Sequence, residues 1–134
     1  MEETPYQIIG EESGVKKLVN RFYDEMDSNP NMKVIRDLHA KSLDTAREKL
    51  FEFLSGWFGG PDLYIQKYGH PRMRARHLPF PIGKVERDQW LVCMRVAMDG
   101  MKLPEGWDRQ IFMSFYQFAT HMMNKTEEEQ PNGQ

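Results

Sequence analysis

The sequence predicts an all-α fold, because three features point the same way. Four segments carry apolar residues at spacings of three and four, which place them along one face of a helix. Alternation of apolar and polar residues, which is typical of half-buried strands, is nowhere sustained. Proline and glycine separate the four segments, as expected where helices end. We expect one domain over residues 1–125, followed by a polar, disordered tail over 126–134.

The first long helix is predicted from its apolar face and from the residues at its ends. Residues 1–13 form a short leader in which Thr4-Pro5 is a helix-start signal, and Ser13 is a candidate N-cap for the helix that follows. Asn29-Pro30-Asn31 is expected to end this helix. Its apolar face comprises Val15, Leu18, Val19, Phe22, Tyr23 and Met26.

A second long helix is predicted after a weakly patterned segment. Residues 32–43 are expected to mix short helix with loop, and Asp44 is a candidate N-cap. Gly59-Gly60-Pro61 is expected to end the second helix. Its apolar face comprises Ala46, Leu50, Phe53, Leu54 and Trp57.

Two further helices are predicted after residues 61–83. Four prolines and two glycines exclude a long regular element within that segment. The third long helix begins near Lys84, and Leu103-Pro104-Glu105-Gly106 ends it. Asp108 is a candidate N-cap for the fourth. The apolar face of the third comprises Trp90, Cys93, Met94, Ala97, Met98 and Met101, and that of the fourth comprises Ile111, Phe112, Phe115, Ala119 and Met122.

Length and composition exclude several classes of protein. A chain of 134 residues with 40% apolar residues suits one packed domain. No apolar run is long enough to span a membrane, and the N-terminus lacks the features of a signal peptide, so we expect a cytoplasmic protein. The single cysteine, Cys93, excludes an internal disulfide and a cysteine-based zinc finger. The balance of 18 basic and 20 acidic residues disfavours general binding of nucleic acid.

The segment GHPRMRARHLPFPIG, residues 69–83, holds most of the side chains that could carry chemistry. A solvated basic face with surface histidines would explain it, and so would a small phosphate or nucleic-acid site. A third hypothesis is a haem site, in which a neutral histidine binds the iron and arginines pair with the propionates. Tyr23 and Trp90 lie on apolar faces and could supply hydrogen bonds to a ligand of the iron. The histidines and arginines of the segment are His70, His77, Arg72, Arg74 and Arg76.

Four segments resemble the group II truncated haemoglobins. They are RFYDEM (21–26), REKLFEFLSGWFGGP (47–61), GHPRMRARHLPFPIG (69–83) and ERDQWLVCMRVAM (86–98), and the resemblance runs from about residue 5 to residue 124. It implies a truncated globin, a two-over-two helical sandwich around a haem. In this family an extended loop replaces the helix before the proximal histidine, which agrees with the proline-rich stretch.

The resemblance also implies a role for individual residues. His77 aligns with the proximal histidine that binds the iron of haem b, while Tyr23 and Trp90 align with distal residues that donate hydrogen bonds to bound dioxygen. Ala46 occupies the position of the distal histidine of myoglobin-like globins and cannot donate. The other implied haem contacts are Arg76 to a propionate, with Tyr64 and Arg74 as weaker candidates, and the apolar residues Phe53, Leu54 and Leu50.

His39 lies nearest to a position at which many relatives carry an aromatic hydroxyl. Three hypotheses stay open for it. It could be a third distal donor, it could bind the iron as a sixth ligand, or it could be a histidine on a surface loop. A sixth ligand would have to leave before another ligand could bind, which would gate the site.

The family implies binding of dioxygen, carbon monoxide or nitric oxide, and the polar distal side favours slow release with redox turnover over oxygen transport. Nitric oxide dioxygenase or peroxidase-like activity would fit, with an unidentified reductase as electron donor. The alternative is a haem-independent helical regulatory or binding module that uses the arginine-rich segment. We expect no nucleic-acid or membrane partner and a monomer or weak dimer.

Overall fold

The computed structural model describes residues 3–125, and every regular element in that range is helical, which confirms the all-α prediction. The predicted tail, residues 126–134, lies outside the described residues. Over 3–125 no helix is both long enough and apolar enough to cross a membrane. The elements are α1 (Pro5–Ile9), α2 (Glu11–Ser28), the 3-10 helix η1 (Pro30–Met32), α3 (Lys33–Arg36), α4 (Asp44–Trp57), α5 (Leu63–Tyr68), α6 (Met73–His77), α7 (Lys84–Asp99) and α8 (Glu105–His121).

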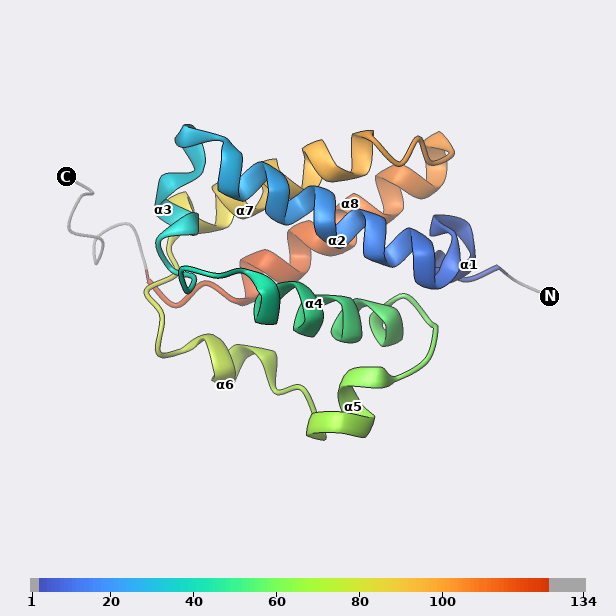
Figure 1. The fold of residues 1–134 in the computed structure, drawn as a ribbon, viewed down its shortest axis with the longest axis horizontal. Helices are drawn as coiled ribbons and strands as arrows, with labels where there is room; N and C mark the ends of the chain where they lie inside the picture. The colour runs from blue at the N-terminus through green and yellow to red at the C-terminus, as the bar shows by residue number, and fades with distance from the viewer. Residues whose placement is uncertain (1–2, 126–134) are drawn as a thin grey trace.

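The four long helices form two pairs, α2 with α4 and α7 with α8. Helix α2 packs against both α4 and α7, and α7 packs against α8 (Figure 1). Aromatic contacts join α4 to α8, since the rings of Trp57 and Phe115 stack with their centres 4.9 Å apart. Helices α5 and α6 lie on the side of α4 that faces away from α2 (Figure 1). The segment 61–83 therefore contains two short helices and no long one, as its prolines predict.

The predicted N-cap at Ser13 is wrong, because α2 begins two residues earlier. Thr4 caps α1, where its Oγ1 accepts from the backbone N–H of Gln7 at 3.2 Å. Gly10 then takes a φ of 107°, which ends α1 and begins α2 without an intervening loop. Ser13 lies inside α2, where its hydroxyl donates to the carbonyl of Gly10 at 3.3 Å.

The two predicted aspartate caps are also displaced. Asp44 is the first residue of α4, and its backbone N–H donates to the Ser42 hydroxyl at 3.2 Å. Asp108 lies one turn inside α8, where Arg95 Nη2 donates to both of its carboxylate oxygens at 2.7 and 2.8 Å. That ion pair links α7 to α8. The residues around Asp108 in the sequence do not show whether it caps a helix or forms such a tertiary contact. The predicted start of α7 at Lys84 is confirmed.

The core lies between the two helix pairs and uses the predicted apolar faces. Cys93 is fully buried in this core, and burial raises the pKa of its thiol to about 12. The thiol is therefore a packing group, as its place on an apolar face predicts. The largest side chains that are almost completely buried are Phe22, Phe58, Phe115, Leu18, Met26, Leu54, Met94 and Met98.

Gly14 is the position at which the α1–α2 junction is most sensitive to substitution. A Cβ atom at Gly14 would lie 1.8 Å from the carbonyl oxygen of Ile9, and backbone cannot move aside as a flexible side chain can. We expect Gly14→Ala to lower the free energy of unfolding by about 1–3 kcal/mol, the usual cost of overpacking. Urea denaturation followed by circular dichroism measures this change.

Gly106 supplies the matched control. It is exposed in the first turn of α8, and a Cβ atom there would have no neighbour within 4 Å among residues 3–125. Gly106→Ala should therefore leave stability unchanged or raise it by up to about 1 kcal/mol, since alanine favours the helix. Equal destabilisation by both substitutions would contradict the close approach at Gly14.

Candidate functional site

A cavity of about 540 Å³ is lined chiefly by residues of α4, α6, α7 and α8, together with the end of α3 and the turn after it. Its volume lies in the range of cofactor sites, which is roughly 300–1,000 Å³. Most of its walls are apolar or aromatic. Nine of the candidate site residues predicted from the sequence line it, namely Tyr23, His39, Ala46, Leu50, Phe53, Tyr64, Arg76, His77 and Trp90.

Leu54 and Arg74 do not line this cavity. Leu54 follows Phe53 by one residue, so the helical turn directs it into the core, where it is 1% exposed. Arg74 precedes Arg76 by two residues on α6, and such residues point in nearly opposite directions. The guanidinium of Arg74 donates to the carbonyl of Met123 at 3.4 Å instead.

His77 ends α6 and faces the cavity with a defined ring nitrogen. Its Nδ1 lies 2.6 Å from the carbonyl oxygen of Met73, one helical turn earlier. A carbonyl only accepts, so Nδ1 carries a proton, and in the neutral form of the ring the lone pair is on Nε2. An imidazole in this tautomer is what a metal ligand requires, with the second nitrogen held by a hydrogen bond.

Asn124 fixes the segment that follows His77, and its role was not predicted from the sequence. Its side-chain amide donates to the carbonyls of Phe80 at 2.8 Å and His77 at 3.3 Å. Its Oδ1 accepts from the backbone N–H of Ile82 at 3.0 Å. The position of Asn124 just beyond α8 is typical of a residue that ends a helix, but the contacts to residues 77–82 depend on tertiary structure.

Tyr23 and Trp90 bring two hydrogen-bond donors to the cavity. Both pack against Phe22, with ring centres 4.8 Å apart for Tyr23 and 5.1 Å apart for Trp90. Within residues 3–125 neither the Tyr23 hydroxyl nor the Trp90 indole N–H has a hydrogen-bond partner. Donors in the interior are normally satisfied, so these two are positioned for a ligand in the cavity. Burial raises the pKa of Tyr23, against a smaller opposing effect of Arg47, and keeps the hydroxyl protonated.

His39 forms part of the cavity wall and is half-buried, so the surface-loop hypothesis does not describe its position. Its Nδ1 lies 2.9 Å from the carbonyl oxygen of Ile35, and its ring meets the Tyr23 ring edge-on at 5.8 Å. Burial lowers the pKa of His39, and electrostatic interactions with Arg36 and His77 act in the same direction. The hydrogen bond to Ile35 opposes this shift.

Three cations line the cavity, of which the sequence indicated one. Arg76 donates through Nε to the carbonyl of Pro71 at 2.6 Å, and its guanidinium lies 5.7 Å from the centre of the Tyr64 ring. Lys49 and Arg87 are the two additional cations. They come from α4 and α7, and no local motif distinguishes them from other surface cations. Together the three suit a ligand with carboxylate groups, which form strong charge-assisted hydrogen bonds.

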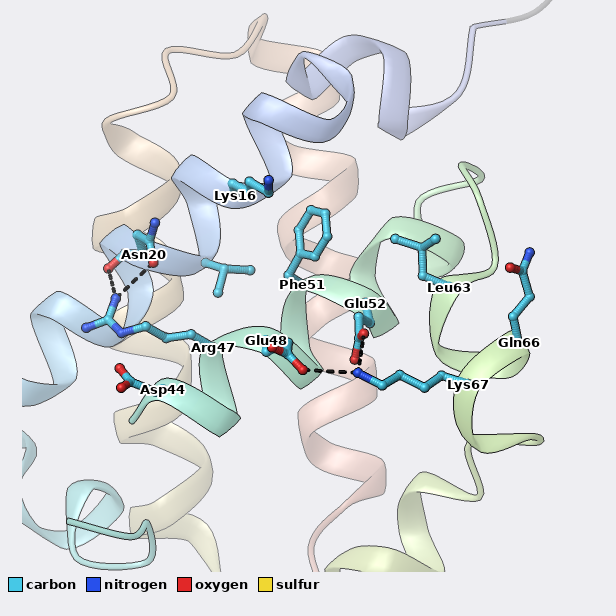
Figure 2. Close-up of a pocket in the computed structure, with 11 residues that line it drawn as sticks. Lys16, Asn20, Asp44, Arg47, Glu48, Phe51, Glu52, Leu63, Gln66 and Lys67 are labelled. Carbon is cyan, nitrogen blue, oxygen red and sulfur yellow. Dashed lines mark hydrogen bonds and ion pairs between the residues drawn. The ribbon is translucent and has the colours of Figure 1, made fainter. Parts of the chain in front are cut away.

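A second hollow, of about 780 Å³, lies between α2, α4 and α5, and several of its polar side chains bind one another (Figure 2). Lys67 of α5 donates to Glu48 at 3.1 Å and to Glu52 at 3.2 Å, both on α4. Arg47 donates to the side chain of Asn20 on α2 at 3.0 Å. The contacts of Lys67 hold α5 against α4, and α5 carries Tyr64 to the first cavity. The contact of Arg47 joins α4 to α2.

The residues of the first cavity fit a haem. His77 offers an unprotonated Nε2 for the iron, apolar and aromatic walls suit the porphyrin, and cations suit the propionates. Tyr23 and Trp90 are unpartnered donors for a further ligand. A two-over-two helical fold around such a cavity defines a truncated globin.

The comparisons with known proteins agree. Residues 4–124 match the family described as bacterial-like globin, and the chain belongs to that family. It is therefore a haem-binding globin, and the resemblance to group II truncated haemoglobins is confirmed.

Three similar proteins illustrate the relationship. Group 2 truncated hemoglobin YjbI of Bacillus subtilis is 44% identical over 126 residues, which cover 93% of this chain and 92% of the relative. The cold-adapted truncated hemoglobin of Pseudoalteromonas haloplanktis TAC125 is 45% identical with a TM-score of 0.89, over 92% of this chain and 99% of that one. The truncated oxygen-avid haemoglobin from Bacillus subtilis is 39% identical with a TM-score of 0.81, over 91% of this chain and 100% of that one.

Proposed function

We propose that the chain holds haem b through His77 and binds dioxygen, or another diatomic molecule, with slow release of dioxygen. Haem supplies a ferrous iron that takes up diatomic molecules and exchanges electrons. The observation that carries the proposal is the pair of unpartnered donors on Tyr23 and Trp90. Dioxygen gains negative charge when it binds, so donors that are already in position and shielded from water retain it.

The cysteine content supports haem b over a c-type haem. Covalent attachment of a c-type haem requires cysteines, and the only one in the chain, Cys93, is buried in the core and does not line the cavity. We therefore propose a haem held by His77 and by non-covalent contacts, which is the mode of haem b.

Slow release of dioxygen favours redox use of the site over oxygen transport. The similarity to the oxygen-avid haemoglobin from Bacillus subtilis supports slow release. We propose that dioxygen held by Tyr23 and Trp90 reacts with nitric oxide, or that the ferric protein reacts with peroxide. Either cycle needs an electron donor, and we propose a separate reductase in the cytoplasm. For the globin itself we propose a monomer or weak dimer.

The test is rapid mixing of the dioxygen-loaded protein with nitric oxide. The proposal predicts one nitrate and one ferric haem per dioxygen consumed, at a rate faster than spontaneous release of dioxygen. A reaction limited by dioxygen release would contradict the redox proposal, since nitric oxide would then be replacing dioxygen and not reacting with it.

The haem-independent alternative has less support. It needs the arginines of residues 69–83 to present a common basic surface. Arg74 instead binds the carbonyl of Met123, and Arg76 binds the carbonyl of Pro71 at the cavity. The arginines thus stabilise separate parts of the chain.

A paired substitution tests the propionate contact proposed for Arg76. Arg76→Gln should speed haem loss to an apomyoglobin acceptor roughly two- to fivefold, because an exposed ion pair contributes about 0.5–1 kcal/mol. Arg74→Gln is the matched control, since Arg74 lies on the same helix but does not line the cavity. Equal effects of the two substitutions would remove the assignment of Arg76.

A further inference from the structure

The two histidines of the cavity are held in the same way. His77 Nδ1 lies 2.6 Å from the carbonyl oxygen of Met73, and His39 Nδ1 lies 2.9 Å from the carbonyl oxygen of Ile35. Each carbonyl belongs to the residue four positions earlier. Because a carbonyl only accepts, the proton of each neutral ring is on Nδ1 and the lone pair is on Nε2.

The surroundings of His39 keep its ring neutral. The ring is half-buried in the cavity wall, and burial lowers its pKa. A neutral His39 that donates through Nδ1 to Ile35 has no N–H on Nε2, which disfavours its role as a third donor.

His39 lies on the same side of the cavity as the two donors. Its ring meets the edge of Tyr23 at 5.8 Å, and both Tyr23 and Trp90 contact Phe22. The ligand pocket therefore combines two unpartnered donors with one basic nitrogen.

We propose that His39 is the hydrogen-bond acceptor for a ligand bound in this cavity. Ligands that carry their own proton, such as hydrogen peroxide or hydrogen cyanide, are thereby favoured over aprotic ligands such as carbon monoxide. This inference rests on the proposed function, because it requires haem held by His77. Of the two redox reactions proposed above, it favours the reaction with peroxide.

Hydrogen cyanide is a probe with a simple proton balance. It binds ferric haem as the cyanide anion, so each binding event releases one proton. His39 Nε2 accepts that proton, while Nδ1–H keeps its hydrogen bond to Ile35, and the imidazolium forms without a turn of the ring. Carbon monoxide has no proton and gains nothing from this group.

The experiment compares wild type with His39→Phe, which keeps an aromatic ring beside Tyr23, and with His39→Gln, whose amide oxygen is a weaker acceptor. At pH 7 we expect the association rate of cyanide to fall about tenfold or more in His39→Phe, as for loss of a general base, with partial recovery in His39→Gln. The association rate of carbon monoxide should change less than about threefold, because its binding involves no proton transfer.

A second readout does not depend on rates. The C–O stretching frequency of the carbon monoxide complex falls when a positive N–H faces the ligand oxygen and rises when a lone pair faces it. His39→Phe should therefore lower this frequency. A higher frequency in the variant would show that His39 is a donor, and would overturn the inference.

The remaining outcomes separate this inference from the proposed function. Faster association of both cyanide and carbon monoxide in His39→Phe would show that His39 binds the iron, and an unchanged cyanide rate would exclude a proton acceptor. Either result leaves haem binding by His77 intact. Failure of the wild-type protein to take up haem would overturn the proposed function and this inference together.

Discussion

Replacement of His77 by glycine is expected to abolish stable haem retention. A hydrogen bond from Nδ1 of His77 to Met73 leaves its Nε2 available for a metal, and the resemblance assigns the iron to this histidine. Without the imidazole, the purified protein should lose its haem to an apomyoglobin acceptor, whereas wild type should retain its haem over the same time. Absorption in the Soret region follows the transfer.

His70 is the matched control for this substitution. It lies in the same segment, is exposed, and does not line the cavity. His70→Gly should therefore retain haem as wild type does. Added imidazole should restore haem binding to His77→Gly, because it replaces the ligand in the vacated position. Unchanged haem stoichiometry in His77→Gly would contradict the proximal assignment.

Removal of the two distal donors is expected to accelerate dioxygen release. Tyr23→Phe and Trp90→Phe each delete one unpartnered donor and retain an aromatic ring against Phe22. The two hydrogen bonds are worth about 1–3 kcal/mol together, so the double variant should release dioxygen roughly 5- to 150-fold faster. Stopped-flow replacement of dioxygen by carbon monoxide measures the rate.

Two controls separate hydrogen bonding from repacking. Tyr116→Phe removes a hydroxyl from a tyrosine that is 41% exposed and does not line the cavity, and should leave the rate unchanged. Release of carbon monoxide, which accepts weaker hydrogen bonds, should be affected less than release of dioxygen. Unaltered dioxygen release in both single variants would remove Tyr23 and Trp90 from the distal role.

Periodicity predicted the helices well because burial imposes it. The apolar faces of α2 and α7 have residues every three or four positions, and these residues form the core. The start of α7 at Lys84 was also predictable, since proline and glycine precede it. Helix caps were less predictable, because Ser13 and Asp108 have the chemistry of caps but are used for other contacts.

Nine of the residues that line the cavity were predicted, and they come from separate segments of the sequence, as Tyr23, His77 and Trp90 do. His77 and Arg76 lie in one distinctive segment, whereas Lys49, Arg87 and Asn124 come from three separate elements and meet only in the folded chain. Leu54 was expected at the haem, but it turns into the core, while its neighbour Phe53 lines the cavity. Alignment with a family indicates which segment approaches the cofactor, and side-chain direction then depends on the turn of each helix.

The tautomer of His39 could not be predicted from the sequence. It depends on the 2.9 Å approach of Nδ1 to the carbonyl of Ile35, and that approach is set by the turn that follows α3. The sequence left donor, iron ligand and surface residue open, and the geometry favours a fourth role as acceptor.

Titration of the purified wild-type protein with hemin tests whether the cavity at His77 holds a haem. We expect a saturable Soret band at one haem per chain, which shifts on reduction with dithionite and again on addition of carbon monoxide. The cavity and His77 provide for one such group. An absorbance that rises without saturation, or that does not respond to carbon monoxide, would contradict the assignment of this cavity as a haem site.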